Sequence, residues 1–423
     1  MIETTLQECL KAVIDNRGVT PHKRGTEWQD YGVPVLSANN IKTTGLQKMD
    51  EIRFIPDDVY SSWMKMPLEK GDIILTSEAP AGEVFYWDSD EKVVLGQRLY
   101  GLKVKDEINS KFLKYYLQSS VGQKAIAQQQ SGSTVMGIAA STFPQIVVRL
   151  PNRADQDAQA DLLYTIDSII SNNNAICSNL EAMAKLLYDY WFVQFDFPDE
   201  KGKPYKSSGG KMVWNDELKR EIPAGWEVKD ILDVCDIVDC LHSKKPDYCY
   251  ENDDCYLLTL ENLTKDGYVD LSNKFYISQS DYDVWTSKIE VSEGDFVVTN
   301  AGRAGDIGRI PNGVKCAIGR NLTAIRPTNI SSIYLNMFLH SFYVQSQIMS
   351  NLDQGSFFAS FNVYAIKKLK VLVPDECMME KALLKFTDII IQMEACQAEN
   401  QQLASLRDFL LPMLMNGQVK VGE

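Results

Sequence analysis

Histidine is scarce in this sequence, and the short motifs that mark most enzyme active sites are missing. Three histidines occur in 423 residues, none beside a second member of a catalytic triad: His22, His242 and His340. No Gly-Lys pair is followed by Ser or Thr, so there is no Walker A sequence. Gly302, Gly305 and Gly308 lack the upstream Gly-x-Gly of a dinucleotide-binding turn. The Asn/Asp-Pro-Pro-aromatic tetrad of amino-methyltransferases is absent as well. We therefore expect a binding protein with no catalytic residues, cofactor or metal of its own.

Long apolar runs and paired cysteines are also lacking. No apolar stretch approaches the ~18 residues of a membrane span, and the N-terminal residues do not have the layout of a signal peptide. A cytoplasmic protein without membrane contacts is expected. The nine cysteines are scattered, and the four that crowd together do not follow a C-x2-C zinc pattern: Cys235, Cys240, Cys249 and Cys255. Reduced, mainly structural thiols are predicted.

Basic residues are outnumbered, but the excess acid is concentrated. The net charge is −14. Residues 151–196 contain two Lys/Arg against seven Asp/Glu, and residues 375–408 contain three against seven. The rest of the chain is near neutral and can carry local basic faces, so the net charge alone does not exclude a nucleic-acid partner.

Residues 156–190 contain neither glycine nor proline and have apolar residues at heptad spacing. This pattern predicts a long helix whose apolar seam packs against a second helix. The expected seam is Leu162, Ile166, Ile169, Asn173, Ile176, Leu180, Met183 and Leu187. About 220 residues later a second seam appears: Phe386, Ile389, Met393, Cys396, Asn400, Leu403 and Leu410, with Arg407 as a charged interruption. An antiparallel intramolecular coiled coil is predicted.

The similarity between the two halves extends beyond these helices and indicates an internal duplication. The segment Lys70–Ser77 recurs as Glu293–Asn300, an offset of 223, with Gly71-Asp72 matching Gly294-Asp295. Gly-Asp before four apolar or β-branched residues is typical of a turn entering a buried strand. We predict two similar α+β lobes with helices at 112–128 and 334–349. The glycine- and proline-containing stretch 196–230 is expected to be an irregular linker, pinned to a lobe surface by Trp214 and Trp226.

Two similar lobes on antiparallel helices would form a pseudo-two-fold protein suited to two spaced half-sites on duplex DNA. A 35-residue helix is about 50 Å long, enough to hold the lobes one or more DNA turns apart. Arginine suits guanine, and asparagine or glutamine suits adenine. The candidate DNA-binding residues are Arg17, Lys23, Arg24, Gln97, Arg98, Lys244, Lys245, Asn300, Arg303, Arg320, Asn321, Gln354, Lys367 and Lys368. The alternative for each of them is a solvated surface residue.

The whole chain resembles the DNA-specificity subunit of type I restriction–modification systems. The resemblance rests on the paired Gly-Asp strands, the two long helices, Tyr190–Phe195 (YWFVQF) and the entry Ile222–Glu227 (IPAGWE) to the second lobe. It implies the following organisation: target-recognition domains at 1–151 and 231–374, helical spacers at 152–195 and 375–416, and a linker at 196–230.

The same resemblance implies a non-catalytic protein that binds a bipartite, asymmetric site on double-stranded DNA. Its helices would dock two methyltransferase (modification) subunits, and restriction motor-nuclease subunits would complete the complex. S-adenosylmethionine and ATP are expected on those partner subunits. Two other functions are left open by the residues: a coiled-coil protein–protein scaffold without DNA recognition, and an enzyme with an unrecognised cofactor motif.

Overall fold

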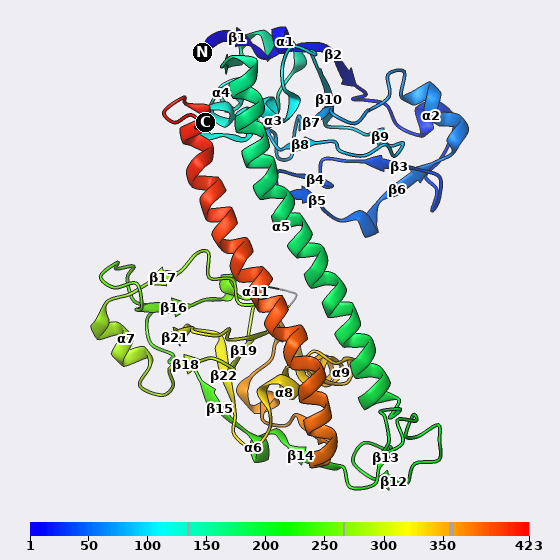
Figure 1. Ribbon diagram of the computed structural model, residues 1–423, viewed down its shortest axis with the longest axis vertical. Coiled ribbons are helices and arrows are strands. Elements are labelled where there is room, and N and C mark those ends of the chain that lie inside the picture. Colours follow the sequence, from blue (N-terminus) through cyan, green and yellow to red (C-terminus); the bar gives the residue numbers. More distant parts are fainter. Residues whose placement is uncertain (133–135, 265–266, 355–358, 423) are drawn as a thin grey trace. The chain divides into compact units, whose positions relative to one another are not determined.

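The structure is a computed structural model that describes residues 1–132, 136–264, 267–354 and 359–422. The chain divides into two compact units (Figure 1). The first unit contains residues 1–171 and 402–423, and the second contains residues 172–401. Each unit is described by itself below.

Each unit is built around a four-stranded antiparallel sheet with the same strand order. In the first unit this sheet is β2 (Leu10–Asp15), β10 (Leu99–Val104), β7 (Ile73–Thr76) and β8 (Val84–Tyr86). In the second unit it is β15 (Cys235–Asp239), β22 (Leu322–Pro327), β19 (Phe296–Thr299) and β20 (Ile307–Arg309). The strands β7 and β19 that follow the two Gly-Asp turns are fully buried, as the sequence predicts.

A second sheet of short strands in each unit contains one parallel strand pair. The first unit has β6 (Arg53–Ile55), β3 (Val33–Leu36) and β9 (Val94–Leu95), and the second has β17 (Phe275–Tyr276), β16 (Tyr256–Leu258), β21 (Lys315–Ile318) and β18 (Val291–Ser292). Strands β3 and β9 are parallel, and so are β16 and β21. In both units a glycine N–H after the parallel strand bonds the partner strand at 2.8 Å, Gly96 to the Leu36 carbonyl and Gly319 to the Leu258 carbonyl. The duplication predicted from the sequence is therefore present in the fold.

Short strands and helices complete the two units. The first unit adds β1 (Ile2–Thr5), α1 (Leu6–Cys9), β4 (Ile41–Lys42), β5 (Gly45–Leu46), α2 (Asp57–Trp63), α3 (Ser110–Gln118), α4 (Ser120–Ala127) and β11 (Val147–Leu150). The second adds β12 (Met212–Asn215), β13 (Arg220–Pro223), β14 (Glu227–Asp230), α6 (Ile231–Val234), α7 (Gln279–Trp285), α8 (Ser332–Leu339), α9 (Phe342–Ser350), β23 (Asp353–Gln354), β24 (Ala359–Ser360), α10 (Val363–Ile366) and β25 (Lys370–Val373). Four 3-10 turns, His22–Arg24, Met49–Glu51, Ala140–Gln145 and Leu260–Asn262, are also present.

The predicted helices at 112–128 and 334–349 are each two helices, which corrects the sequence-based expectation. The breaks fall at Ser119 and Ser341, because each serine hydroxyl accepts a hydrogen bond from a backbone N–H and caps the following helix. Gly122 does not end a helix. A Cβ there would lie 2.1 Å from the Tyr116 carbonyl oxygen, so glycine is required for the close approach of α4 to α3.

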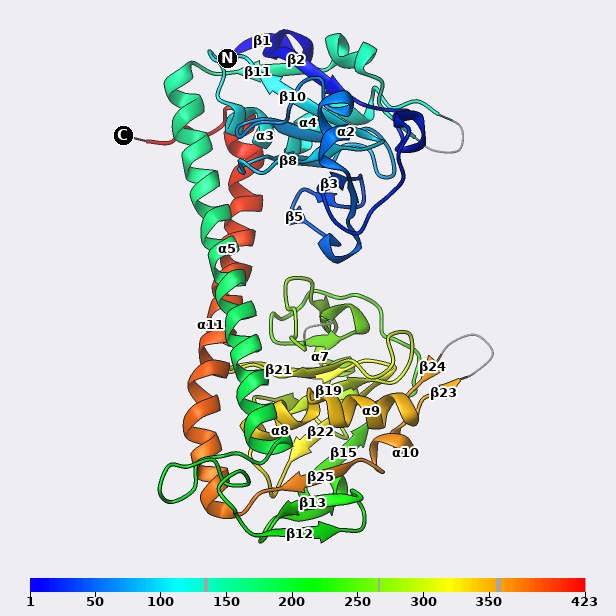
Figure 2. The same cartoon turned by 90° about the vertical axis from the view of Figure 1, so that its right-hand side faces the viewer.

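Each unit contains a segment of the same two long helices, which run antiparallel (Figures 1 and 2). These helices are α5 (Arg153–Tyr188) and α11 (Glu376–Met415). In the first unit Asp167 meets Arg407 at 3.1 Å. In the second unit the Asn173 amide donates to Asn400 at 3.0 Å, and the Cys177 thiol to the Met393 carbonyl at 3.7 Å. The predicted helix pairing is confirmed in both units.

The predicted seam of α5 is wrong at every second position. Ile169, Ile176 and Met183 are 36–49% exposed, whereas Ile166 and Asn173 are buried and Leu162, Leu180 and Leu187 are half-buried. The buried face continues instead through Cys177 and Ala184. These small side chains allow α11 to approach closely, so the contact face is rotated toward them and away from the larger apolar residues. On α11, Phe386, Ile389 and Met393 are buried, and Cys396, Asn400, Leu403 and Leu410 are half-buried.

The expected linker 196–230 is not wholly irregular. It contains the antiparallel hairpin β12–β13, whose four residue pairs run from Met212 opposite Pro223 to Asn215 opposite Arg220. Trp226 is buried against Phe192, Phe195 and Phe197, as expected for an anchoring residue. Trp214 is 61% exposed, so its predicted anchoring role is wrong. Within the described ranges, no helix combines the length and the apolar character that crossing a bilayer requires.

Candidate nucleic-acid interface

A tight turn at equivalent places in the two units presents the most promising polar side chains. These turns are residues 96–98 and 319–321, and their last residues, Arg98 and Asn321, have positive φ angles of 66° and 65°. The Arg98 carbonyl accepts from the Ser77 N–H at 2.9 Å, and the Asn321 carbonyl accepts from the Asn300 N–H at 2.8 Å. The backbone of each turn is therefore fixed while its side chains, including the exposed Gln97 and Arg320, face solvent.

In the first unit, turn 96–98 borders a cavity of about 410 Å³. Its wall also includes Trp28, Asn39, Lys48, Arg53 and Trp63. Gln97 and Asn39 are exposed, and neither has an intramolecular hydrogen bond within the described part of the chain. Arg98 lies 3.4 Å from Glu78 in an ion pair that is half open to solvent. This concave surface combines aromatic walls with amide and guanidinium donors, the groups that contact base edges.

The remaining first-unit candidates lie in the segment after β2. Arg17 pairs with Asp15 at 2.8 Å, and its guanidinium lies 4.5 Å from the centre of the Tyr100 ring. The side-chain hydrogen bonds that Arg17 donates to Asp15 raise the pKa of Arg17, so the cation is permanent and its donors are largely engaged. Lys23 donates to the Gly18 carbonyl at 2.7 Å, and Arg24 is exposed in the same 3-10 turn.

Two second-unit candidates are engaged inside the protein. The Asn300 amide donates to the Phe361 carbonyl at 3.1 Å and accepts from the Thr323 hydroxyl at 3.0 Å. Arg303 donates to the carbonyls of Leu260 and Leu263 and pairs with Asp306. Both side chains are therefore bonded to neighbouring loops. Either would have to break these hydrogen bonds before it could contact a base.

The other second-unit candidates are exposed. Lys244 and Lys245 follow β15, and the Lys245 ammonium lies 3.6 Å from the centre of the Phe275 ring. Lys367 and Lys368 follow α10, where the Lys368 ammonium lies 4.1 Å from the centre of the Tyr364 ring. Gln354 ends β23, and its side chain lies outside the described part of the structure.

Sequence reasoning missed three residues of the first-unit cavity: Trp28, Asn39 and Arg53. The Arg53 guanidinium lies 5.4 Å from the centre of the Trp28 ring. No motif and no cluster of basic residues marks Trp28 and Arg53 in the sequence, because the two residues belong to separate segments that the fold brings together. The available signal was the alignment of the two halves, in which Arg53 corresponds to Phe275, 222 positions later.

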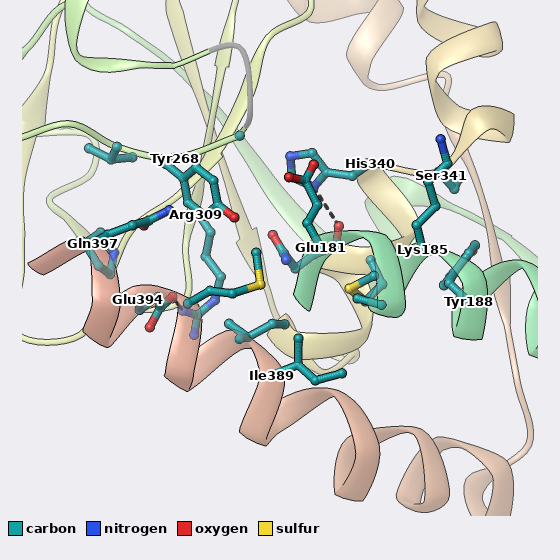
Figure 3. A pocket seen from close by; sticks show the side chains of 18 of the residues that line it. Glu181, Lys185, Tyr188, Tyr268, Arg309, His340, Ser341, Ile389, Glu394 and Gln397 are labelled. Carbon is teal, nitrogen blue, oxygen red and sulfur yellow. Dashed lines mark hydrogen bonds and ion pairs between the residues drawn. The ribbon is translucent and has the colours of Figure 1, made fainter. Parts of the chain in front are cut away.

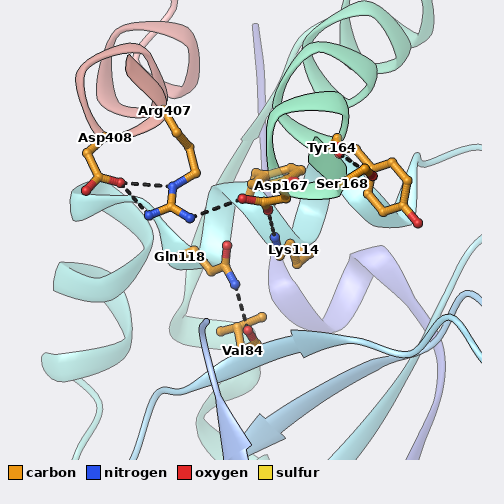
Figure 4. Close-up of polar contacts among 9 residues, drawn as sticks. Val84, Lys114, Gln118, Tyr164, Asp167, Ser168, Arg407 and Asp408 are labelled. Carbon is orange, nitrogen blue, oxygen red and sulfur yellow. Dashed lines mark hydrogen bonds and ion pairs between the residues drawn. The ribbon is translucent and has the colours of Figure 1, made fainter. Parts of the chain in front are cut away.

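A polar network joins the long helices to the first unit (Figure 4). Asp167 on α5 accepts from Lys114 at 2.9 Å, from the Tyr115 hydroxyl at 2.6 Å and from Arg407 on α11 at 3.1 Å. Burial lowers the pKa of Lys114 to about 8, although Asp167 opposes this shift. Burial also acts to raise the pKa of Asp167, but the surrounding cations and hydroxyl keep it below its usual value. This network therefore holds α5 and α11 against α3.

A second cavity, of about 130 Å³, lies within the second unit and is lined by apolar and polar residues of α5, α8, α11 and the neighbouring loops (Figure 3). At its edge the Arg309 guanidinium pairs with the Glu394 carboxylate, and both side chains are largely buried. Burial raises the pKa of Glu394 despite the neighbouring arginine. We interpret this cavity as part of the helix packing.

One group of potential metal ligands occurs among the described residues: Asp239, Cys240 and His242. The His242 Nε2 atom lies 2.9 Å from Asp239 Oδ2, and His242 is exposed. Cys240 is buried, and burial raises the pKa of its thiol. A thiol kept protonated in an apolar cluster is a poor ligand. The sequence-based expectation of no metal site stays a prediction.

The known proteins that resemble this chain include specificity proteins of type I restriction–modification systems. Residues 4–182 match the family described as type I restriction modification DNA specificity domain. The MjaIX specificity subunit of Methanocaldococcus jannaschii is 23% identical over 84% of this chain and 79% of its own length. The HindI specificity subunit of Haemophilus influenzae is 20% identical over 93% of this chain and 100% of its own. The crystal structure of the type I restriction–modification S subunit from M. genitalium superposes with a TM-score of 0.59 at 15% identity, covering 98% of this chain and 95% of that one, and so shares the fold.

Proposed function

Because the chain belongs to the specificity subunits of type I restriction–modification systems, a non-catalytic family, we propose that it selects the DNA site at which its complex acts. The site would be bipartite and asymmetric, with one half bound by each unit. Turns 96–98 and 319–321 would enter the DNA grooves, since they are the equivalent rigid turns that present exposed polar side chains.

The equivalence of the two turns is the observation that carries this proposal. Their backbones are held alike, but their side chains differ: Gln97 and Arg98 in the first unit, Arg320 and Asn321 in the second. Two turns with the same backbone but different hydrogen-bonding side chains are suited to the recognition of two unlike half-sites. Lys23, Arg24, Lys244, Lys367 and Lys368 would contribute phosphate contacts, which strengthen binding without discriminating between bases.

The long helices would dock two methyltransferase subunits, with restriction motor-nuclease subunits completing the complex and S-adenosylmethionine and ATP bound by those partners. The support is an exposed apolar row on α5, comprising Ile169, Ile176, Met183 and Leu186. Solvent-exposed apolar residues in a row on one helix favour a protein partner. The acidic character of both helices favours a partner surface with basic residues.

Co-expression with candidate modification subunits, followed by sequencing of methylated adenines, tests this function. One bipartite motif, abolished when the chain is omitted, is expected. A mobility-shift assay on random-sequence DNA separates this from the scaffold alternative: complex formation without any DNA retention would leave only the scaffold. Retention of S-adenosylmethionine by the isolated chain would favour the enzyme alternative.

A further inference from the structure

The edge strand of the small sheet carries an equivalent cation–aromatic pair in both units. Arg53 in β6 lies opposite Val35 of β3, and Phe275 in β17 lies opposite Leu257 of β16, each second-unit residue 222 positions after its counterpart. In the first unit the strand supplies the cation, Arg53, over the ring of Trp28. In the second unit the strand supplies the ring, Phe275, under the ammonium of Lys245.

In both units, backbone hydrogen bonds hold a neighbouring loop against this edge strand. Gln29 and Phe54 exchange two backbone hydrogen bonds, at 3.0 and 3.2 Å, which fixes the adjacent Trp28 beside β6. In the second unit the Cys249 N–H bonds the Tyr276 carbonyl at 3.0 Å, which fixes the adjacent Tyr248 against Phe275. In both copies of the duplicated sheet an exposed cation therefore lies on an aromatic ring at this edge strand, supplied by the strand in the first unit and by the neighbouring loop in the second.

Arg53 differs from most arginines of the first unit in having no carboxylate partner. The paired arginines are Arg17, Arg98, Arg149, Arg153 and Arg407. Arg53 lies over the ring of Trp28, and both residues line the cavity together with Gln97. The contact with Trp28 positions the guanidinium, while no carboxylate among the described residues pairs with its N–H donors, so the group can bind two acceptors at once.

We propose that Arg53 is a specificity-determining residue of the first unit, which donates both hydrogen bonds to O6 and N7 of one guanine in its half-site. Guanine alone offers two adjacent acceptors in the major groove, and arginine has donors only. Trp28 is a positioning residue, because it orients the guanidinium. Lys245, which lies over the ring of Phe275, the counterpart of Arg53, carries a compact ammonium that contacts phosphate in the second half-site and does not select a base.

This inference rests on the proposed function, and the test separates the two. The chain in complex with its modification subunits methylates a random-sequence library, and methylated adenines are sequenced for the wild type, Arg53→Ala, Arg53→Lys and the control Arg149→Ala, whose side chain pairs with Glu3. Both Arg53 variants are expected to lower the preference for one guanine by roughly 5- to 150-fold, leaving the other half-site unchanged. Arg149→Ala should keep the wild-type motif. Lys245→Ala should weaken methylation of all sequences about equally.

Replacement of that guanine by 7-deazaguanine gives a second measurement that needs no variant. The change removes the N7 acceptor, so wild-type binding should fall, while binding by Arg53→Ala should not fall further. An unchanged motif in Arg53→Ala, wild-type preference in Arg53→Lys (a phosphate contact), or a first half-site without guanine would overturn the assignment of Arg53 alone. A wild-type complex that methylates no defined motif would overturn the proposed function itself.

Discussion

Asp167 on α5 and Arg407 on α11 form an ion pair of 3.1 Å inside the first unit. Arg407 is the one charged interruption of the second apolar seam, and Asp167 lies between two expected seam positions of the first. The carboxylate also accepts from Lys114 and Tyr115 of α3. One half-buried acid thus joins three helices, and its removal should show how the long helices are attached to this unit.

Asp167→Ala should lower the free energy of unfolding of the first unit by about 3–5 kcal/mol, because Lys114 and Arg407 would remain partly buried without their counter-charge. Asp408→Ala is the matched control. It removes the other carboxylate beside Arg407, but Asp408 is exposed, so a loss of at most about 1 kcal/mol is expected. Urea denaturation followed by circular dichroism measures both. Equal losses would show that Asp167 has no special role.

The burial of Lys114 predicts that the free energy of unfolding is higher at alkaline pH than at neutral pH. Its pKa is about 8 in the folded chain because of burial, whereas an unfolded lysine titrates near 10.4. Between these values the unfolded state binds more protons, so the free energy of unfolding should rise with pH, by about 3 kcal/mol across the window. Lys114→Met should remove this rise. Denaturation midpoints of the two proteins at pH 7.5 and 9.5 give the comparison, and parallel changes would refute the assignment.

The Arg309–Glu394 pair should show the asymmetry of a buried ion pair in the second unit. Arg309→Ala leaves a carboxylate whose pKa burial already raises, and should cost about 3–5 kcal/mol. Replacing both residues by methionine removes the charge and fills the space, so the double variant should be close to the wild type. A double-mutant cycle by thermal denaturation tests this. Additive losses would mean that the two side chains do not interact.

The existence of the duplication, the strands after Gly-Asp and the long helices could be predicted from the sequence, because each depends on local periodicity or internal similarity. The face of α5 could not, because apolar size suggested Ile176 and Met183, whereas close helix approach selects Cys177 and Ala184. Residue type also cannot show whether a polar side chain is already bonded. Asn300 and Arg303 were suitable candidates by chemistry, but the fold uses them internally.

Side chains brought together by pairing of distant strands were equally out of reach. Trp28 and Arg53 are separated by 25 positions with no motif between them, and the backbone pairing of Gln29 with Phe54 places the loop of Trp28 beside Arg53. The basic residues flanking the first strands were found because clustering of charge is visible in a sequence. Freedom from an internal partner, which distinguishes Arg53 from Arg17, is a property of the fold.

The exposed apolar row of α5 gives the last prediction. Ile176 and Met183 lie seven residues apart, about two turns, and therefore on the same helix face. Ile176→Glu with Met183→Glu should leave the unfolding free energy nearly unchanged, because both side chains are already exposed. Binding of modification subunits should weaken at least tenfold, since two charges would have to be buried in the interface. Ser178→Glu adds the same charge to an exposed position of the same helix and should have little effect. Calorimetric titration of modification subunits measures all three, and unimpaired binding by the double variant would place the docking surface elsewhere.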